Sequence, residues 1–256
     1  MNILICFSII FILILIHTLW PRYVYDPQYE VLDVFDVLKE NPDIRLETGD
    51  ILFAKNCTKC KYNDNIINNG FQFLFKNTFN SFRWYFMNMV NYTHVAIILR
   101  LNINGVEKPY ICHIDGGDPM YDVIRKKYIS KESAVVCDMD HLNERGGVMH
   151  IYKYKGPKIE KDMMYWILKN RNIKYPSSTY NLAMVNALKW CKNPEGVMAC
   201  TDFVENTLCE LNIIDKEIVS GQSTVKDIIN IVKYNDHYSN TPIVLKNKCF
   251  EEKHFS

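Results

Sequence analysis

A cysteine and two histidines are the side chains of this sequence best suited to nucleophilic chemistry. Cys200 follows loop residues and precedes apolar residues at helical spacing, so we expect it to begin a helix. The positive end of the helix dipole and the N–H groups of the first turn stabilise a thiolate, which lowers the pKa of a cysteine placed there. Cysteine is also one of the most frequently buried residue types, so simple packing is the competing interpretation.

A thiolate nucleophile needs a base, and the base needs a group that orients it. His94 opens a predicted strand, and His113 lies on the predicted partner strand. From there His113 could orient and polarise His94 through its other ring nitrogen. Asp115, two residues after His113, is the alternative orienting group. The spacing alone leaves open whether the histidines and Cys200 meet.

The elements that must position these residues are strands first and helices later. The apolar runs 94–99 and 110–114 flank Asn104-Gly105, a pair typical of a tight hairpin turn. Further strands are predicted over 51–54, 134–137 and 148–154, and helices over 159–168, 200–211 and 224–232. Strands followed by helices, without regular βαβ alternation, predict an α+β domain around an antiparallel sheet.

An uncharged apolar run extends from Ile3 to Trp20. At about 1.5 Å per residue, a helix of this length nearly crosses the roughly 30 Å hydrocarbon layer of a bilayer. A cleaved signal peptide is the alternative, but no basic residue precedes the run and no small-x-small cleavage pattern follows it. We expect a single-pass anchor over 1–22, a tether over 23–45 with a short helix through 31–39, and a catalytic domain over 46–256.

The residues near this anchor favour a catalytic body on the cytoplasmic side of the membrane. Arg22, Lys39 and Arg45 follow the anchor, as the positive-inside tendency requires. Asn91 begins a glycosylation sequon close to His94, and a glycan there would crowd the expected site. Nine cysteines, an odd number without the dense spacing of small secreted domains, favour a reducing compartment.

Charge and ligand spacing exclude several other classes of protein. The 30 basic and 29 acidic side chains give a net charge of +1, so no overall field attracts nucleic acid, and we expect no nucleic-acid partner. Cys57 and Cys60 form a lone CxxC pair, whereas a zinc site needs two more ligands at suitable spacing. We expect no metal and no cofactor, and we rank a thiol-disulfide oxidoreductase using this pair well below a thiol hydrolase.

Five short segments, taken in their order, resemble the circularly permuted branch of the NlpC-like papain-fold superfamily. This branch includes lecithin:retinol acyltransferase-like enzymes, bacterial lipoproteins and a group of poxviral proteins. The matching segments are Gly49-Asp50-Ile51-Leu52-Phe53, Thr93-His94-Val95-Ala96-Ile97, Tyr110-Ile111-Cys112-His113, Tyr180-Asn181 and Ala199-Cys200-Thr201-Asp202-Phe203-Val204. The resemblance implies a permuted papain-like fold with its antiparallel sheet packed against helices.

The resemblance also implies roles for individual residues. Cys200 would attack, His94 would be the base, and His113 would be the third member, where bacterial relatives often have Glu. Tyr180 and Asn181 would line the substrate cleft. The stretch before His94 is longer than the family pattern, which makes its aromatic residues, between 71 and 86, a feature of this chain.

The expected function is a hydrolase or acyltransferase that cleaves ester or amide bonds through a thioester on Cys200. The predicted bilayer contact and the aromatic stretch favour a lipid acyl substrate slightly over a peptide amide. The alternative is a catalytically idle viral or membrane scaffold that keeps the fold for interaction.

Overall fold

The structure, a computed structural model, describes residues 31–33, 44–56, 94–114, 119–129, 133–139, 147–176, 193–218 and 222–246. Several predicted features lie outside these ranges: the anchor over 1–22, the Cys57/Cys60 pair, the aromatic stretch, Asp115, Tyr180 and Asn181. In the described ranges, no helix has the length and apolar character needed to cross a membrane.

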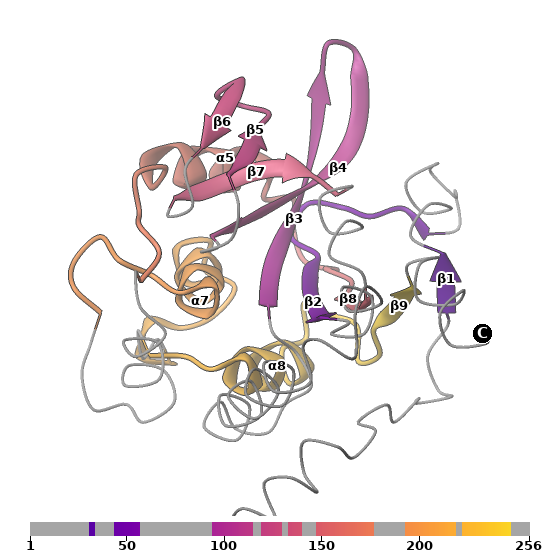
Figure 1. Ribbon diagram of the computed structural model, residues 1–256. Helices are drawn as coiled ribbons and strands as arrows, with labels where there is room; N and C mark the ends of the chain where they lie inside the picture. The colour runs from indigo at the N-terminus through magenta and orange to yellow at the C-terminus, as the bar shows by residue number, and fades with distance from the viewer. Residues whose placement is uncertain are drawn as a thin grey trace, which may run out of the picture.

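A seven-stranded sheet forms the centre of the molecule. Its strands lie in the order β1-β9-β8-β2-β3-β4-β7, and all neighbours are antiparallel except β1 and β9, which are parallel. Figure 1 shows this order from β1 at one edge toward β3 and β4. The strands are β1 (Val31–Asp33), β2 (Ile51–Asn56), β3 (His94–Ile103), β4 (Val106–Ile114), β7 (Ala134–Asp138), β8 (Gly147–Tyr152) and β9 (Ile243–Lys246).

The other elements within the described ranges are a small hairpin and a few helices. They are β5 (Met120–Asp122), β6 (Lys127–Ile129), α5 (Glu160–Lys169), α7 (Cys200–Glu210), the 3₁₀ helix η3 (Lys216–Ile218) and α8 (Val225–Lys233). The predicted α+β class with an antiparallel sheet is therefore confirmed. The predicted start of α8 is confirmed in detail, because the side chains of Thr224 and Asp227 each accept a hydrogen bond from the other's backbone N–H.

The β3–β4 hairpin turns where the sequence predicted. Asn104 has φ 54° and Gly105 has φ 83°, the two left-handed conformations that a type I′ hairpin turn requires. The register pairs Ile97 with Cys112. Because the turn fixes this register, the start of β3 lies beside the end of β4.

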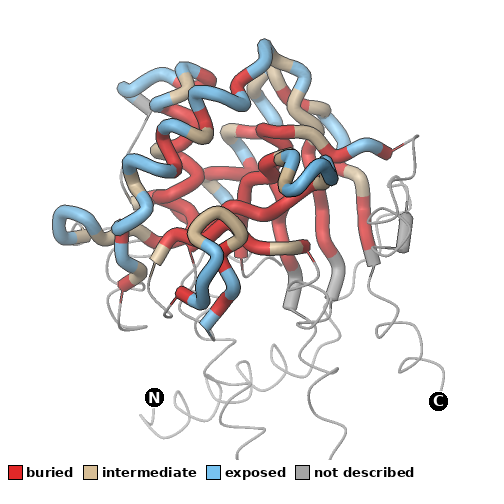
Figure 2. The backbone as a smooth tube through the Cα atoms, turned by 90° about the horizontal axis from the view of Figure 1, so that it is seen from above, coloured by how far each residue is buried: buried red, intermediate tan, exposed pale blue. Residues whose placement is uncertain are grey.

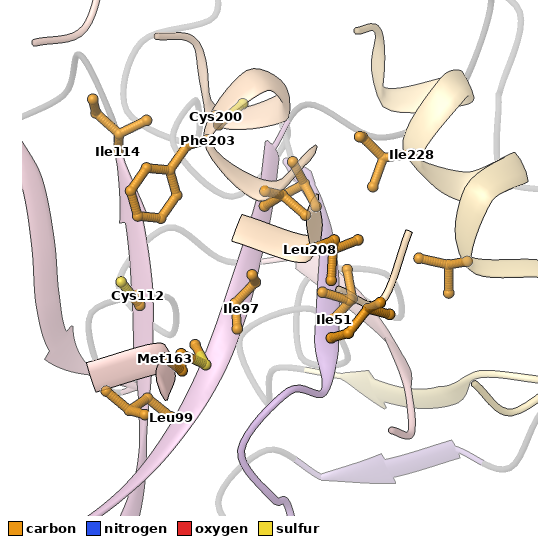
Figure 3. Close-up of a cluster of buried hydrophobic side chains, with 14 of the residues drawn as sticks. Ile51, Ile97, Leu99, Cys112, Ile114, Met163, Cys200, Phe203, Leu208 and Ile228 are labelled. Carbon is orange, nitrogen blue, oxygen red and sulfur yellow. The ribbon is translucent and has the colours of Figure 1, made fainter. Parts of the chain in front are cut away.

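The two faces of the sheet carry different hydrophobic cores. On one face, side chains of the strands pack against α5, α7 and α8, and we call this cluster the helix-side core. It contains Ile51, Phe53, Val95, Ile97, Cys112, Ile114, Met163, Cys200, Phe203, Val204, Leu208 and Ile228 among others. Figure 3 shows Phe203 and Leu208 of α7 over strand residues Ile97 and Cys112.

The other face carries the second cluster, which we call the opposite-side core. It contains Leu46, Leu52, Ala54, Ala96, Ile98, Ile111, Val135, Cys137, Met149, Ile151 and Leu245 among others. Alternate residues of each strand therefore enter different cores, as the period of two in a strand dictates. Figure 2 shows the described backbone with buried residues through its interior and exposed residues around its outside.

A buried carboxylate fixes the start of β2. Asp50 accepts hydrogen bonds from the backbone N–H groups of Glu47 and Tyr154 and pairs with Lys153. Gly49 precedes it with φ +98°, and a Cβ at Gly49 would lie 2.9 Å from Ile159 Cδ1. The glycine is thus required both by its backbone conformation and by its close contact with the residue before α5.

The structure differs from the sequence prediction at the N-terminal edge of the sheet. Val31–Asp33 was expected to lie in a tether and to begin a short helix, but these residues form β1. The strand pairs Val31 with Val244 and Leu32 with Leu245, so a partner far along the chain overrides the local pattern. The sheet therefore takes in residues from the expected tether.

Candidate functional site

The hairpin brings His94 and His113 into direct contact. His94 Nε2 lies 2.7 Å from His113 Nδ1, and the ring centroids are 4.9 Å apart at an interplanar angle of 79°. His113 is 0% exposed and His94 is 8% exposed. At this distance one nitrogen donates and the other accepts, so the two imidazoles share one proton position between them.

Strand register determines the face on which the two rings lie. His94 is opposite Ala54 on β2, and His113 is opposite Val135 on β7. Residues directly opposite each other in an antiparallel pair share a face. Ala54 and Val135 both belong to the opposite-side core, so both imidazoles project from that face.

Cys137 on β7 extends the contact beyond the pair. Its Sγ lies 3.4 Å from His113 Nε2, within reach of a hydrogen bond that involves sulfur. The sequence predicted a strand at this position but assigned Cys137 no role. The contact follows from the register of β4 against β7. Because no short turn joins these two strands, the sequence does not indicate that register.

Cys200 is the first residue of α7, as the sequence predicted. Ala199 precedes it in an extended conformation, with φ −74° and ψ 169°, and accepts from Phe203 N–H at 2.9 Å to begin the helix. The first N–H groups of a helix have no intrahelical acceptor and carry partial positive charge. This end of α7 therefore favours an anion at or near Cys200.

Asp202 opposes that effect from the same turn. Its carboxylate is 2% exposed and accepts from Ala199 N at 3.2 Å, Asn193 Nδ2 at 2.9 Å and Ser223 N at 3.0 Å. Hydrogen bonds to a carboxylate reduce its field on neighbouring groups without removing its charge. Two groups with opposing effects on a thiolate therefore lie in the first turn of α7: the helix N-terminus and the buried, hydrogen-bonded Asp202.

The structure places Cys200 in the helix-side core, on the face of the sheet that α7 covers. Figure 3 shows it toward the end of β4 marked by Ile114, with Leu99 and Met163 at the other end of the view. That end of the sheet is also where β3 begins at His94. The two histidines meet directly, whereas Cys200 and the pair share an end of the sheet and lie on opposite faces.

Burial controls the chemistry of two other thiols. It raises the pKa of Cys112, on the helix-side face of β4, well above the ordinary value. It also raises the pKa of Cys209, at the far end of α7 from Cys200. These thiols are therefore poor nucleophiles near neutral pH. Within the described ranges, no three His, Cys, Asp or Glu side chains form a group able to hold a metal ion.

Comparison with known proteins gives no relative: no protein-family model, no curated protein and no solved structure matches the chain.

Proposed function

We propose that the protein is a membrane-anchored cysteine hydrolase or acyltransferase that acts on ester or amide bonds through a thioester on Cys200. The observation that carries the proposal is the buried contact between His94 and His113, because a base held by a second group is what an activated thiol requires. The start of α7 at Cys200 supports it. The proposal assigns the domain to a permuted papain-like fold and residues 1–22 to an anchor.

In this proposal the two ring nitrogens of His94 have different roles. His94 Nε2 faces His113, so the proton of the Cys200 thiol passes to His94 Nδ1. The thiolate then attacks the substrate carbonyl carbon, and the backbone N–H of Cys200 donates to the oxyanion. His94 returns the proton to the departing alcohol or amine as its bond to the acyl carbon breaks. Water or another acceptor, deprotonated by His94, cleaves the thioester and regenerates the Cys200 thiol.

This mechanism makes one demand on the geometry. The His94 ring must reach past the start of β3 toward the N-terminus of α7. His94 is the first described residue of β3, at the end of the sheet that Cys200 shares. In this proposal Tyr180 and Asn181 line the cleft that the substrate enters.

The substrate proposed is a lipid acyl ester or amide, with a peptide amide as the second choice. An anchor over 1–22 would hold the catalytic body against the bilayer, on its cytoplasmic side, where acyl chains are available. The aromatic residues between 71 and 86 supply apolar surface suited to such chains.

A catalytically idle scaffold is the second candidate, and a specific observation favours it. The imidazoles project from the face of the sheet opposite the one that carries Cys200. Such an arrangement suits a histidine pair that stabilises the hairpin, with Cys200 packed as a core residue. The two candidates differ in whether His94 controls the ionisation of Cys200.

The test is the pH dependence of alkylation of each cysteine in the full chain in detergent micelles, with iodoacetamide and peptide mapping. We expect the Cys200 profile to have a midpoint below pH 7. His94→Ala should raise that midpoint by about one unit, which is about tenfold in thiolate fraction below the pKa. Cys209 is the internal control, because it lies at the other end of α7. If the pH profile of Cys200 matches that of Cys209 and does not change in His94→Ala, the protein is the catalytically idle scaffold.

A further inference from the structure

The contact between His113 and Cys137 joins three buried side chains into one chain of polar atoms. His94 Nε2 lies 2.7 Å from His113 Nδ1, and His113 Nε2 lies 3.4 Å from Cys137 Sγ. Cys137 is 2% exposed and His113 is 0% exposed. Three neighbouring strands, β3, β4 and β7, contribute one member each. The protonation of each ring is therefore linked to that of its neighbour.

Such a chain has two self-consistent hydrogen-bonding directions when both imidazoles are neutral. In the first, His94 Nε2–H donates to His113 Nδ1, and His113 Nε2–H donates to Cys137 Sγ. In the second, every donor and acceptor is exchanged, with the Cys137 thiol donating to His113. The first direction leaves the lone pair of His94 on Nδ1, and the second places a proton there.

The direction of these hydrogen bonds decides whether His94 can act as a base. Only a His94 with an unprotonated Nδ1 can take a proton there. A buried ring N–H left without an acceptor costs free energy, so an acceptor beside His113 Nε2 favours the tautomer that carries its proton on that nitrogen. Cys137 Sγ occupies this position, and because a thiol S–H is a weak donor, the direction in which the imidazole N–H donates to sulfur is the favoured one.

We propose that Cys137 is a positioning residue that accepts a hydrogen bond from His113 Nε2–H and so holds His94 in the tautomer with a basic Nδ1. Its consequence for catalysis rests on the function proposed above, whereas the tautomers themselves do not. Cys137 touches neither the substrate nor Cys200 in this role. Its effect passes through the two histidines.

The direct test is ¹⁵N NMR of the full chain with labelled histidine, in detergent micelles, with His113 assigned by the His113→Gln variant. We expect protonated Nε2 and unprotonated Nδ1 for His113 in the wild-type protein. Cys137→Ala should populate both tautomers, because the contact between His113 Nε2 and Sγ is removed. Cys137→Ser should retain the wild-type pattern, because a hydroxyl oxygen also accepts. A proton on His113 Nδ1 in the wild type, or no change in Cys137→Ala, would overturn the proposal.

Cys112→Ala is the matched control for loss of a buried thiol. Cys112 is 0% exposed and lies next to His113 on β4, but it belongs to the helix-side core. Its removal should leave the histidine tautomers unchanged. Equal changes in Cys112→Ala and Cys137→Ala would mean that repacking, and no specific contact, sets the tautomers, which also overturns the proposal.

The second readout is the alkylation profile of Cys200 in the same variants. Cys137→Ala should raise the Cys200 midpoint by about 0.3 unit, because roughly half of the His94 rings keep a basic Nδ1, and Cys137→Ser should not. Equal Cys200 midpoints in the wild type and in His94→Ala would contradict the proposed function. The NMR result would then still decide the role of Cys137. If the Cys200 midpoint is low in the wild type, rises in His94→Ala and is unchanged in Cys137→Ala, only the positioning role of Cys137 is contradicted.

Discussion

Single residues of this protein are controlled largely by desolvation, and Tyr238 is a clear example. Its side chain is 2% exposed, and its hydroxyl donates to Gly49 O at 3.1 Å. Burial raises the pKa of Tyr238 well above its ordinary value of 10.0, with Tyr154 and Asp50 adding to the shift. The folded protein therefore keeps this phenol protonated at pH values where the unfolded chain ionises it.

Tyr238 should make the protein sensitive to alkaline unfolding. Its contribution to stability is fully present below pH 10 and is lost as the pH rises from there through the folded-state pKa. Tyr238→Phe should lower the unfolding free energy at pH 7 by about 1 kcal/mol, through the lost hydrogen bond. It should also reduce the decline above pH 10 by up to about 1.4 kcal/mol per pH unit.

Urea unfolding measured from pH 7 to 11 checks this expectation. Tyr234→Phe is the control, because Tyr234 is 87% exposed and should affect neither quantity. An equally steep alkaline decline in Tyr238→Phe and the wild type would mean that other groups cause it.

At the same scale, the sequence could predict some members of the candidate site and not others. The neighbouring positions of His94 and His113 follow from a two-residue turn at Asn104 and Gly105, which fixes the register of the hairpin locally. The contact with Cys137 depends on pairing between β4 and β7, which no short turn sets. The relation of Cys200 to the histidines depends on how α7 packs on the sheet, and sequence spacing carries no information on that packing.

At the scale of secondary-structure elements, the junction of β2 with α5 depends on a residue without a side chain. Gly49 has φ +98°, and an added Cβ would lie 2.9 Å from atoms of both Ile159 and Tyr154. Gly105 has φ +83°, but an added Cβ would have no atom within 4 Å. The two glycines therefore share a backbone requirement and differ in steric surroundings.

This difference predicts unequal costs for the same substitution. Gly105→Ala should lower the unfolding free energy by about 1 kcal/mol, through backbone strain alone. Gly49→Ala should cost about 3 kcal/mol, because overpacking against Ile159 and Tyr154 adds to the strain. Chemical denaturation of both variants gives the comparison. Equal losses of unfolding free energy would show that Tyr154 and Ile159 move aside without a further cost in stability.

The elements that the sequence predicted are those with strong local signals. Apolar spacing predicted α5 and α7, and a capping box predicted α8. The short strands β1, β5, β6 and β9 have three or four residues each, too few to display a period. Their existence depends on partners elsewhere in the chain, and for β1 the partner is near the C-terminus.

At the scale of the whole molecule, the parallel pairing of β1 with β9 protects one edge of the sheet. Without β1, the backbone groups of Ile243–Lys246 on that side would be exposed as an edge strand. A division of the chain at residue 46, as the sequence suggested, would remove this protection. Residues 31–33 therefore belong with the folded domain.

Two shortened chains test this conclusion. One begins at residue 28 and keeps β1, and the other begins at residue 44 and lacks it; neither carries the predicted anchor. We expect the shorter chain to lose about 2 kcal/mol of stability and to unfold about 5 °C lower. It should also self-associate, as light scattering would detect. Equal melting temperatures and two monodisperse samples would show that β1 adds nothing to the sheet.

The same pairing has a consequence during synthesis. Val31 and Val244 are neighbours in the sheet although roughly 200 positions separate them along the chain, a contact of very high sequence separation. The β1 segment leaves the ribosome before its partner, which emerges only after roughly 200 further residues have been made. A nascent chain stopped before Ile243 would leave both β1 and the outer side of β8 without a neighbour. Such intermediates expose unpaired strand edges, which makes the unfinished domain a natural client for chaperones.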